Sequence, residues 1–171
     1  GAFLQPTAEG EAAMATFIAA RLDGAARVAD LFSGWGPFAL RLADPMHVEA
    51  YEGDAAMIGA LNRAAGAADL GGHLKGFVRD LARQPLLAED LARFDGVVLD
   101  PPRRGAPEQA AALAATGPAR LVYLSCSPPA LARDARLLVD GGYRFVEVQA
   151  IDQFRWTPHL EAAAYFERPA P

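Results

Sequence analysis

Short apolar segments rich in β-branched residues alternate along the chain with alanine-rich segments. Short apolar runs bounded by turn residues indicate buried strands, whereas apolar residues spaced three and four apart indicate helices. The alternation of the two predicts a mostly parallel sheet covered by helices. Seven strands are expected, at Arg27–Phe32, His47–Glu52, Leu74–Val78, Phe94–Asp100, Arg120–Ser125, Arg144–Ile151 and Ala162–Glu167.

Helices are expected between most of these strands. The first begins after Thr7, a suitable N-cap, and its apolar face carries Met14, Phe17, Ile18 and Leu22. Further helices are expected at Ala55–Ala65, Pro107–Ala115 and Pro129–Val139.

The connection between the last two strands differs from the others. It covers only residues 152–161, whereas a parallel crossover needs about a dozen residues or more. We therefore expect an α/β fold with a seven-stranded, mostly parallel sheet whose last strand is antiparallel.

The composition agrees with one ordinary domain over residues 1–171. Of these residues, 52% are hydrophobic and 22% charged, and there is one cysteine. A chain of this size folds without a disulfide or a metal. No apolar run approaches the roughly 20 residues of a membrane span, so a cytoplasmic monomer without a membrane partner is expected. The net charge of −5 argues against unaided binding of nucleic acid, because Lys and Arg supply most non-specific affinity for phosphates.

A glycine-containing loop follows the first strand. Gly34, Gly36 and Ala39 satisfy the glycine pattern of dinucleotide-binding loops, in which the backbone closely approaches a ligand. Glu52 ends the second strand, where an acid accepts hydrogen bonds from ribose hydroxyls. Asp54 is expected to cap the next helix.

Acids stand at the carboxyl ends of the first four strands, namely Asp30, Glu52, Asp80 and Asp100. One aspartate in such a place is more often a turn or cap residue. Ligands of open α/β sheets bind at this edge, however, and four acids along it favour a ligand site.

The only cysteine, Cys126, follows the fifth strand and precedes a helix that begins with prolines. A lone cysteine is commonly a small buried hydrophobe. Its place at the ligand-binding edge favours a nucleophile instead, and a helix N-terminus can lower the pKa of a thiol. Upstream, Pro101 and Pro102 stiffen the segment Asp100–Gly105, which we expect to position a substrate.

Together these residues resemble the family of RNA 5-methyluridine methyltransferases. The glycine loop is common to many folds, whereas a cysteine motif followed by His-x-Glu is specific to this family. The matching segments are Phe3–Gln5, Asp30–Phe38, Asp100–Gly105, Ser125–Pro128 with Leu131–Asp134, Gly142–Tyr143 and His159–Glu161. Departures from the family pattern stand at Thr7, Ser33, Pro37 and Ser127.

The resemblance implies a Rossmann-like methyltransferase fold, S-adenosylmethionine as cofactor, RNA as substrate and no metal. The thiolate of Cys126 would attack carbon 6 of uracil, carbon 5 would take the methyl group, and Glu161 would remove the carbon-5 proton as the base. His159 is a candidate for orienting the uracil or Glu161. Cofactor contacts are implied for Gln5, Phe32, Gly34, Gly36, Glu52, Asp80 and Asp100.

Family members usually carry RNA-binding regions upstream, which answers the objection from net charge. Ribosomal RNA is favoured slightly over transfer RNA as the substrate. In this chain Arg103, Arg104, Arg133 and Arg155 are candidates for phosphate contacts.

Three other functions remain open on the sequence. A nicotinamide-dependent oxidoreductase explains the glycine loop and Glu52, but gives no role to Cys126 or Glu161. A non-catalytic domain could keep the same fold. Methylation at another RNA or small-molecule position would need no enzyme thiolate.

Overall fold

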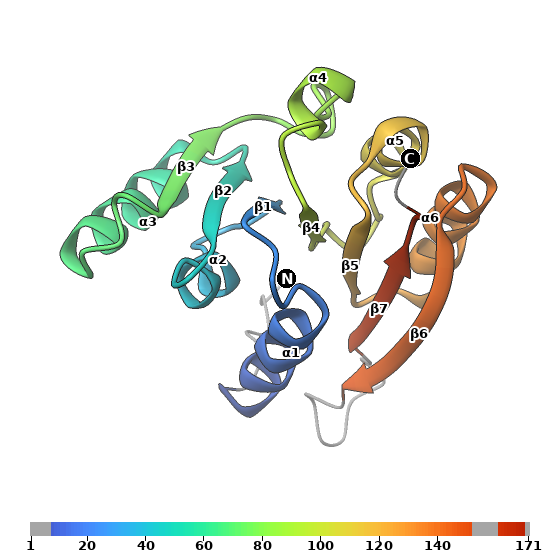
Figure 1. Cartoon of the computed structure of the whole chain (residues 1–171), viewed down its shortest axis with the longest axis horizontal. Helices are drawn as coiled ribbons and strands as arrows, with labels where there is room; N and C mark the ends of the chain where they lie inside the picture. Colours follow the sequence, from blue (N-terminus) through green and yellow to red (C-terminus); the bar gives the residue numbers. More distant parts are fainter. Residues whose placement is uncertain (1–7, 152–160, 170–171) are drawn as a thin grey trace.

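A computed structural model describes residues 8–151 and 161–169 of the chain. Seven strands form one sheet in the order β3-β2-β1-β4-β5-β7-β6 (Figure 1). The neighbours from β3 to β5 pair parallel, and β7 pairs antiparallel with both β5 and β6. The strands are β1 (Arg27–Leu31), β2 (His47–Glu52), β3 (Leu74–Val78), β4 (Gly96–Leu99), β5 (Arg120–Ser125), β6 (Arg144–Ile151) and β7 (Glu161–Glu167).

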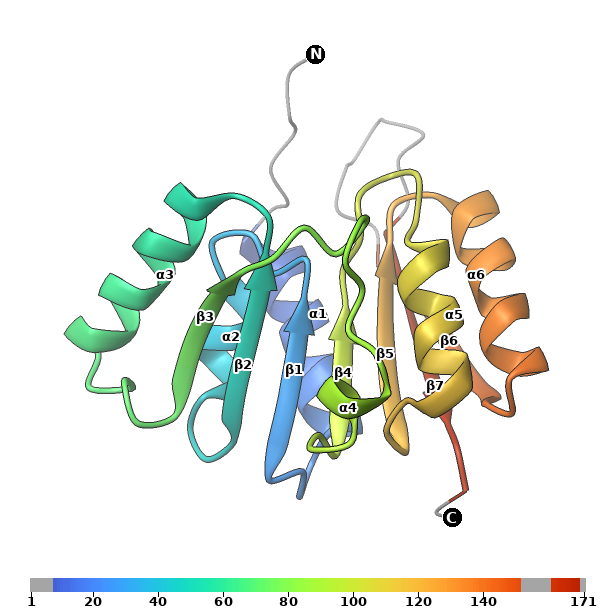
Figure 2. The ribbon, with the colours of Figure 1, turned by 90° about the horizontal axis from the view of Figure 1, so that it is seen from above.

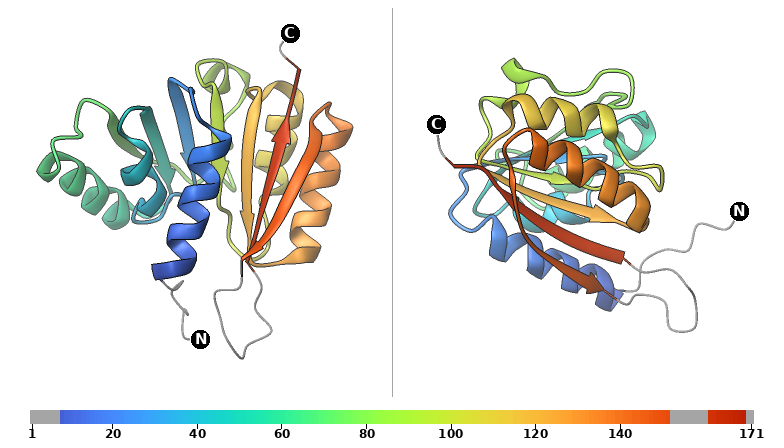
Figure 3. Two further views of the ribbon diagram at one scale, coloured as in Figure 1. Left: turned by 60° about the horizontal axis from the view of Figure 1, so that its bottom comes forward. Right: turned by 90° about the vertical axis from the view of Figure 1, so that its right-hand side faces the viewer.

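Helices cover both faces of the sheet, as Figure 3 shows. One apolar cluster joins α1, α2 and α3 to the first face, and a second joins α4, α5 and α6 to the other. The helices are α1 (Ala8–Arg21), α2 (Pro37–Leu42), α3 (Ala55–Ala67), α4 (Ala88–Leu91), α5 (Pro107–Thr116) and α6 (Pro128–Asp140). No helix among the described residues is long and apolar enough to cross a bilayer.

The expected elements are confirmed, with shifts of a residue or two at several ends. Met14, Phe17, Ile18 and Leu22 are buried as the apolar spacing predicted. β4 is shorter than expected because the N–H of Phe94 bonds to the Leu91 carbonyl, which ends a turn there. Thr7 lies outside the described residues.

The antiparallel direction of the last strand is also confirmed, but its position adds something the sequence did not predict. β7 lies between β5 and β6 instead of at the edge of the sheet. Its first residues therefore meet the carboxyl end of β5, where Ser125 pairs with Ala162. In Figure 2 the parallel strands end along one edge of the sheet, where the loops after β1, β2, β4 and β5 gather.

Candidate active site

The loop between β1 and α2 turns sharply through left-handed backbone. Phe32, Gly34 and Gly36 have φ angles of 62°, 55° and 78°. A Cβ on Gly36 would lie 2.3 Å from Cδ1 of Leu61, so a side chain there would collide with α3. A Cβ on Gly34 would meet nothing within 4 Å. The backbone of Gly34 is thus open to a ligand, whereas Gly36 is needed for close packing of the loop on α3.

Glu52 joins this loop to the one that follows β2. Its carboxylate accepts hydrogen bonds from the N–H of Gly34 at 3.2 Å and from the N–H of Asp54 at 3.0 Å. Asp54 in turn accepts from the N–H of Ala56 at 2.7 Å, which confirms the expected cap of α3. Glu52 therefore joins the two loops at this edge, and its side chain is only partly buried.

Asp80 stands at the same edge, after β3. It is exposed, and its Oδ1 accepts from the N–H of Ala82 at 3.1 Å, as a turn residue does. A Cβ on Gly53 would lie 3.8 Å from the Asp80 Cα, which places Asp80 beside the loop that follows β2.

Asp30 is the most unusual acid of the edge, and it was not among the residues expected to bind the cofactor. It is completely buried, and no well-aligned hydrogen bond reaches either carboxylate oxygen within the described residues. Burial raises its pKa to about 7, Glu52 adds to the rise, and the N–H of Ala39 opposes it. A buried carboxylate without a good partner is costly unless something else pairs with it.

Asp100 extends this acidic group toward the other end of the edge. Its N–H bonds to the Leu31 carbonyl at 3.1 Å, which ties the end of β4 to β1. Burial raises its pKa to about 8, and the charges of Asp30 and Glu161 add to the effect. Asp100 is thus close enough to both Asp30 and Glu161 for their charges to act on it.

Cys126 and Glu161 meet through the antiparallel pairing of β5 and β7. Ser125 pairs with Ala162, so Cys126 and Glu161 each stand one residue beyond this pair, at the ends of neighbouring strands. The Ser125 hydroxyl donates to the Ser127 carbonyl at 3.0 Å and accepts from the Ser127 N–H at 3.1 Å, which holds the chain in a tight turn around Cys126.

The pKa of Cys126 is raised, contrary to the effect that a helix N-terminus could have had. Burial contributes most, and the charges of Glu161 and Asp100 contribute further; Arg103 and the backbone N–H of Cys126 oppose them. The first two residues of α6 are prolines, so this N-terminus lacks two of the N–H groups that stabilise an anion. Burial, together with the two carboxylates, outweighs what remains.

The structure therefore gathers most of the expected site residues at one edge. Phe32, Gly34, Gly36, Glu52, Asp80, Asp100, Cys126 and Glu161 all stand in loops at, or on strand ends of, this edge. Gln5, Arg155 and His159 lie outside the described residues. In the described part of the chain no group of three His, Cys, Asp or Glu side chains could hold a metal ion.

Solved structures define the class of protein to which this arrangement belongs. The tRNA (uracil-54, C5)-methyltransferase of Pyrococcus abyssi, in complex with S-adenosyl-L-homocysteine, matches 97% of this chain and 40% of its own, with a TM-score of 0.83 and 27% identity. The geranyl diphosphate C-methyltransferase of Streptomyces coelicolor, 13% identical, has the same fold, with a TM-score of 0.72 over 92% of this chain and 80% of its own. The chain has the fold of S-adenosylmethionine-dependent methyltransferases.

Sequence comparison narrows the class to a family. The family model for tRNA (uracil-5-)-methyltransferase matches residues 67–169. An uncharacterized RNA methyltransferase of Mesorhizobium japonicum is 48% identical over 169 residues, which is 99% of this chain and 41% of the relative. A 23S rRNA (uracil(1939)-C(5))-methyltransferase of Dechloromonas aromatica is 43% identical over 148 residues, 84% of this chain and 34% of the relative.

The chain belongs to the tRNA (uracil-5-)-methyltransferase family. It spans about two fifths of the length of the curated relatives that it matches along nearly its whole length.

Proposed function

We propose that residues 1–171 form the catalytic domain of an enzyme that methylates carbon 5 of uridine in RNA, with S-adenosylmethionine as methyl donor. Cys126 is the nucleophile and Glu161 the base. Family membership favours this function over a nicotinamide-dependent oxidoreductase. We favour ribosomal RNA as the substrate because the relative named for 23S rRNA is 43% identical, whereas the matching tRNA enzyme is 27% identical.

The observation that carries the proposal is the opposition of Cys126 and Glu161 across the β5–β7 pair. The two side chains are close enough that the charge of Glu161 acts on the thiol. Methylation of carbon 5 needs a nucleophile for carbon 6 and a base for carbon 5 of the same ring, because these carbons are adjacent. A thiol and a carboxylate at neighbouring strand ends, close enough to interact, suit that requirement.

The acidic edge fits the proposed methyl donor. S-adenosylmethionine carries positive charge on its sulfur and its amino group and has two ribose hydroxyls. The buried carboxylate of Asp30, without a well-aligned partner among the described residues, suits a cationic ligand, and Asp100 lies between it and Glu161. Each carboxylate oxygen of Glu52 already accepts one backbone N–H and has a second acceptor position for a ribose hydroxyl, and the open side of Gly34 allows close approach. Phe32 and Asp80 would line the same site, with Gln5 as a further contact.

The chemistry follows from what these residues can do. Bound S-adenosylmethionine supplies an electrophilic methyl group. The thiolate of Cys126 adds to carbon 6 of uracil and makes carbon 5 an enolate carbon, which takes the methyl group. Glu161 removes the proton from carbon 5, and the returning electron pair expels the Cys126 thiolate, so that the enzyme is restored. Asp100 stands between methyl donor and base, and Arg103 favours the thiolate.

RNA binding is proposed for the whole protein, because the chain covers only part of its relatives and has a net charge of −5. A base in a folded RNA would have to leave its stack to reach Cys126.

The test is covalent trapping with RNA that contains 5-fluorouridine. Fluorine at carbon 5 does not leave as a proton, so the adduct between Cys126 and the methylated base accumulates. Mass spectrometry of the protein, incubated with this RNA and S-adenosylmethionine, should show one RNA-linked, methylated species that is missing in Cys126→Ala. Loss of the signal in Cys126→Ala assigns it to this thiol, which is the single cysteine of residues 1–171.

Other outcomes would contradict the proposal in different ways. Full methyltransferase activity in Cys126→Ala would exclude the covalent mechanism and favour methylation at another atom. An absence of S-adenosylmethionine binding in calorimetry would exclude the methyl donor and return the nicotinamide and non-catalytic alternatives.

A further inference from the structure

Two segments of the candidate site are fastened to each other by a buried aspartate of α6. Asp134 is 0% exposed. Its Oδ2 accepts hydrogen bonds from the N–H of Ala106 at 2.8 Å and from the hydroxyl of Tyr123 at 2.6 Å. Ala106 directly follows the Asp100–Gly105 loop, and Tyr123 lies in β5, three residues before Cys126. Asp134 thus bonds to both segments at once.

Arg133 completes this connection. Its Nε donates to Oδ1 of Asp134 at 2.8 Å, and its Nη2 donates to the Arg104 carbonyl, also at 2.8 Å. Arg104 belongs to the same loop that carries Arg103. Arg133 was a candidate for phosphate contacts in RNA; in the structure its Nε and Nη2 are engaged by Asp134 and the Arg104 carbonyl.

Gly105 lets the loop pack directly on the ion pair. Its φ of +76° is unfavourable for other residues. A Cβ there would lie 2.5 Å from Oδ2 of Asp134 and 2.6 Å from Nη2 of Arg133. Three consecutive residues therefore contact Arg133 and Asp134. The Arg104 carbonyl and the Ala106 N–H do so through hydrogen bonds, and Gly105 does so by close packing.

We propose that Arg133 and Asp134 are positioning residues of the proposed methyl-transfer site, which hold the Asp100–Gly105 loop so that Arg103 stands beside Cys126. The role of these residues in methyl transfer rests on the proposed function. The position of Arg103 beside Cys126 does not, and it can be tested through the reactivity of the thiol alone.

The reason for such a device lies in the charges around the thiol. Glu161 from β7 and Asp100 from the loop disfavour the thiolate, while Arg103 favours it. Arg103 is exposed, so the position of its guanidinium depends on the backbone that carries it. A hydrophobic pair of similar volume in place of Arg133 and Asp134 would often stabilise a protein equally well. An ion pair with directed bonds to the loop, in contrast, fixes one geometry.

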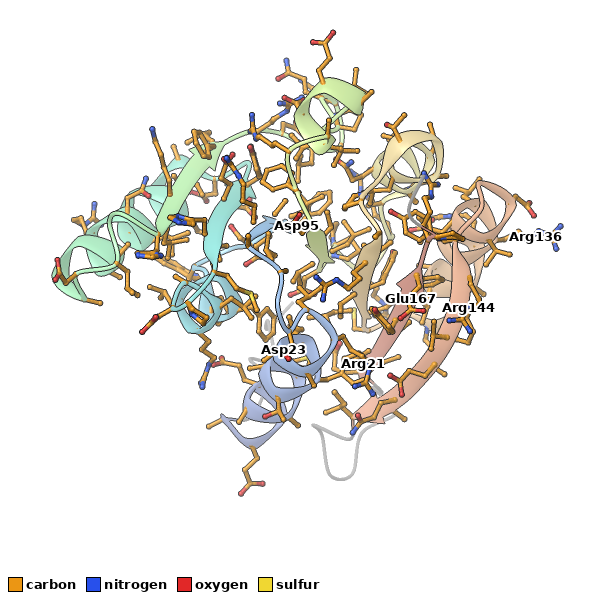
Figure 4. The ribbon with its side chains drawn as sticks, viewed as in Figure 1. Arg21, Asp23, Asp95, Arg136, Arg144 and Glu167 are labelled. Carbon is orange, nitrogen blue, oxygen red and sulfur yellow. The ribbon has the colours of Figure 1, made fainter. Side chains whose placement is uncertain are left out.

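The experiment compares Arg133→Met with Arg136→Met by alkylation with iodoacetamide between pH 6 and pH 10. Cys126 is the only thiol, so the rate reports it directly. Arg136 is on the same helix, 78% exposed, paired with Asp140 and directed away from the sheet (Figure 4). Both variants remove one positive charge from α6. Only Arg133→Met removes the hydrogen bond to the loop. This variant should slow alkylation at pH 8 by about threefold and shift the dependence of the alkylation rate on pH to higher pH, because the rate follows the fraction of thiolate.

A second substitution keeps the test decisive if Arg133→Met folds poorly. In Arg133→Lys the positive charge beside Asp134 is kept. Lysine has a single ammonium nitrogen, however, and cannot bond to Asp134 and to the Arg104 carbonyl through separate nitrogens as the guanidinium does. This variant should unfold near the wild-type temperature and still be alkylated more slowly. Wild-type profiles in both Arg133 variants would overturn the proposal, as would an equal change in Arg136→Met.

The same measurements separate this proposal from the proposed function. A wild-type protein that forms no adduct with 5-fluorouridine RNA would contradict the function, while the alkylation profiles would still show whether Arg133 positions the loop.

Discussion

Replacing Asp30 with asparagine is expected to stabilise the protein without ligand, and to do so more strongly at alkaline pH. Asp30 is fully buried without a well-aligned hydrogen bond in the described part of the chain. Its pKa rises from 3.8 to about 7 on folding, mainly through burial. An acid whose pKa is raised by folding contributes no penalty below its unfolded pKa. The penalty then grows as the pH rises toward the folded pKa.

The size of the effect follows from this difference. A rise of roughly three pKa units corresponds to about 4 kcal/mol of lost stability above pH 7, of which about 1.5 kcal/mol is already lost at pH 5. Asparagine has no such charge, so Asp30→Asn should gain about 2 to 3 kcal/mol more at pH 8.5 than at pH 5. Relief of Asp100, whose pKa Asp30 helps to raise, acts in the same direction.

Urea and thermal unfolding at the two pH values provide the assay. For a chain of this length the extra gain corresponds to roughly 4 to 10 °C in Tm. Asp95→Asn is the control. Asp95, labelled in Figure 4, is an exposed aspartate directly before β4, at the opposite end of the strand from Asp100, and accepts from the N–H groups of Ala26 and Arg27. This variant should show no extra gain at pH 8.5. The reasoning is refuted if Asp30→Asn gains nothing, or gains equally at both pH values.

Three further predictions concern the same edge. Gly36→Ala should lower the free energy of unfolding in urea by about 2 kcal/mol or more and weaken S-adenosylhomocysteine binding in calorimetry, because backbone strain and a collision with α3 add up. Gly34→Ala, where a Cβ meets open space, should lower it by about 1 kcal/mol. Equal losses in the two variants would contradict the packing argument. Glu161→Gln should speed alkylation of Cys126 at pH 8, because the carboxylate raises the pKa of the thiol. In mass spectrometry the same variant should leave methylated RNA attached to the protein. Slower alkylation would contradict the effect of Glu161 on Cys126. Between pH 6 and pH 9 the preference for S-adenosylmethionine over its neutral, demethylated product should increase. The reason is that Asp30 and Asp100, with pKa values of about 7 and about 8, ionise in that range. A constant ratio of the two Kd values would show that neither carboxylate faces the sulfonium.

The fold could be predicted from the sequence because its elements follow local patterns. Strand segments such as His47–Glu52 and Arg120–Ser125 agree with the structure residue for residue. The cap at Asp54 also depends only on its neighbours. α4 was missed because its single turn, Ala88–Leu91, is too short to show helical spacing.

The site could be predicted only in part, because its parts meet through tertiary structure. No spacing in the sequence indicates that β7 inserts beside β5, so the pairing of Cys126 with Glu161 came from family resemblance alone. The rise of the thiol pKa was not predicted for the same reason: the helix is local, whereas burial, which contributes most, and the charges of Glu161 and Asp100 depend on tertiary structure. The bonds of Asp134 likewise join residues distant in sequence.

The contact between α1 and the β6–β7 hairpin has a consequence for synthesis of the chain. Arg21 bonds to Glu147 of β6, and its guanidinium lies 6.0 Å from the ring of Tyr165 in β7. Thus α1, the first of the described helices to be synthesised, packs on β6 and β7, which are the last of the described strands to be synthesised. A chain that stops before β7 would have the thiol of Cys126 but would lack Glu161, the proposed base, and part of the cover for α1. It would expose apolar surface that attracts chaperones and proteases. Catalytic competence and resistance to degradation would then be acquired together, with the same strand.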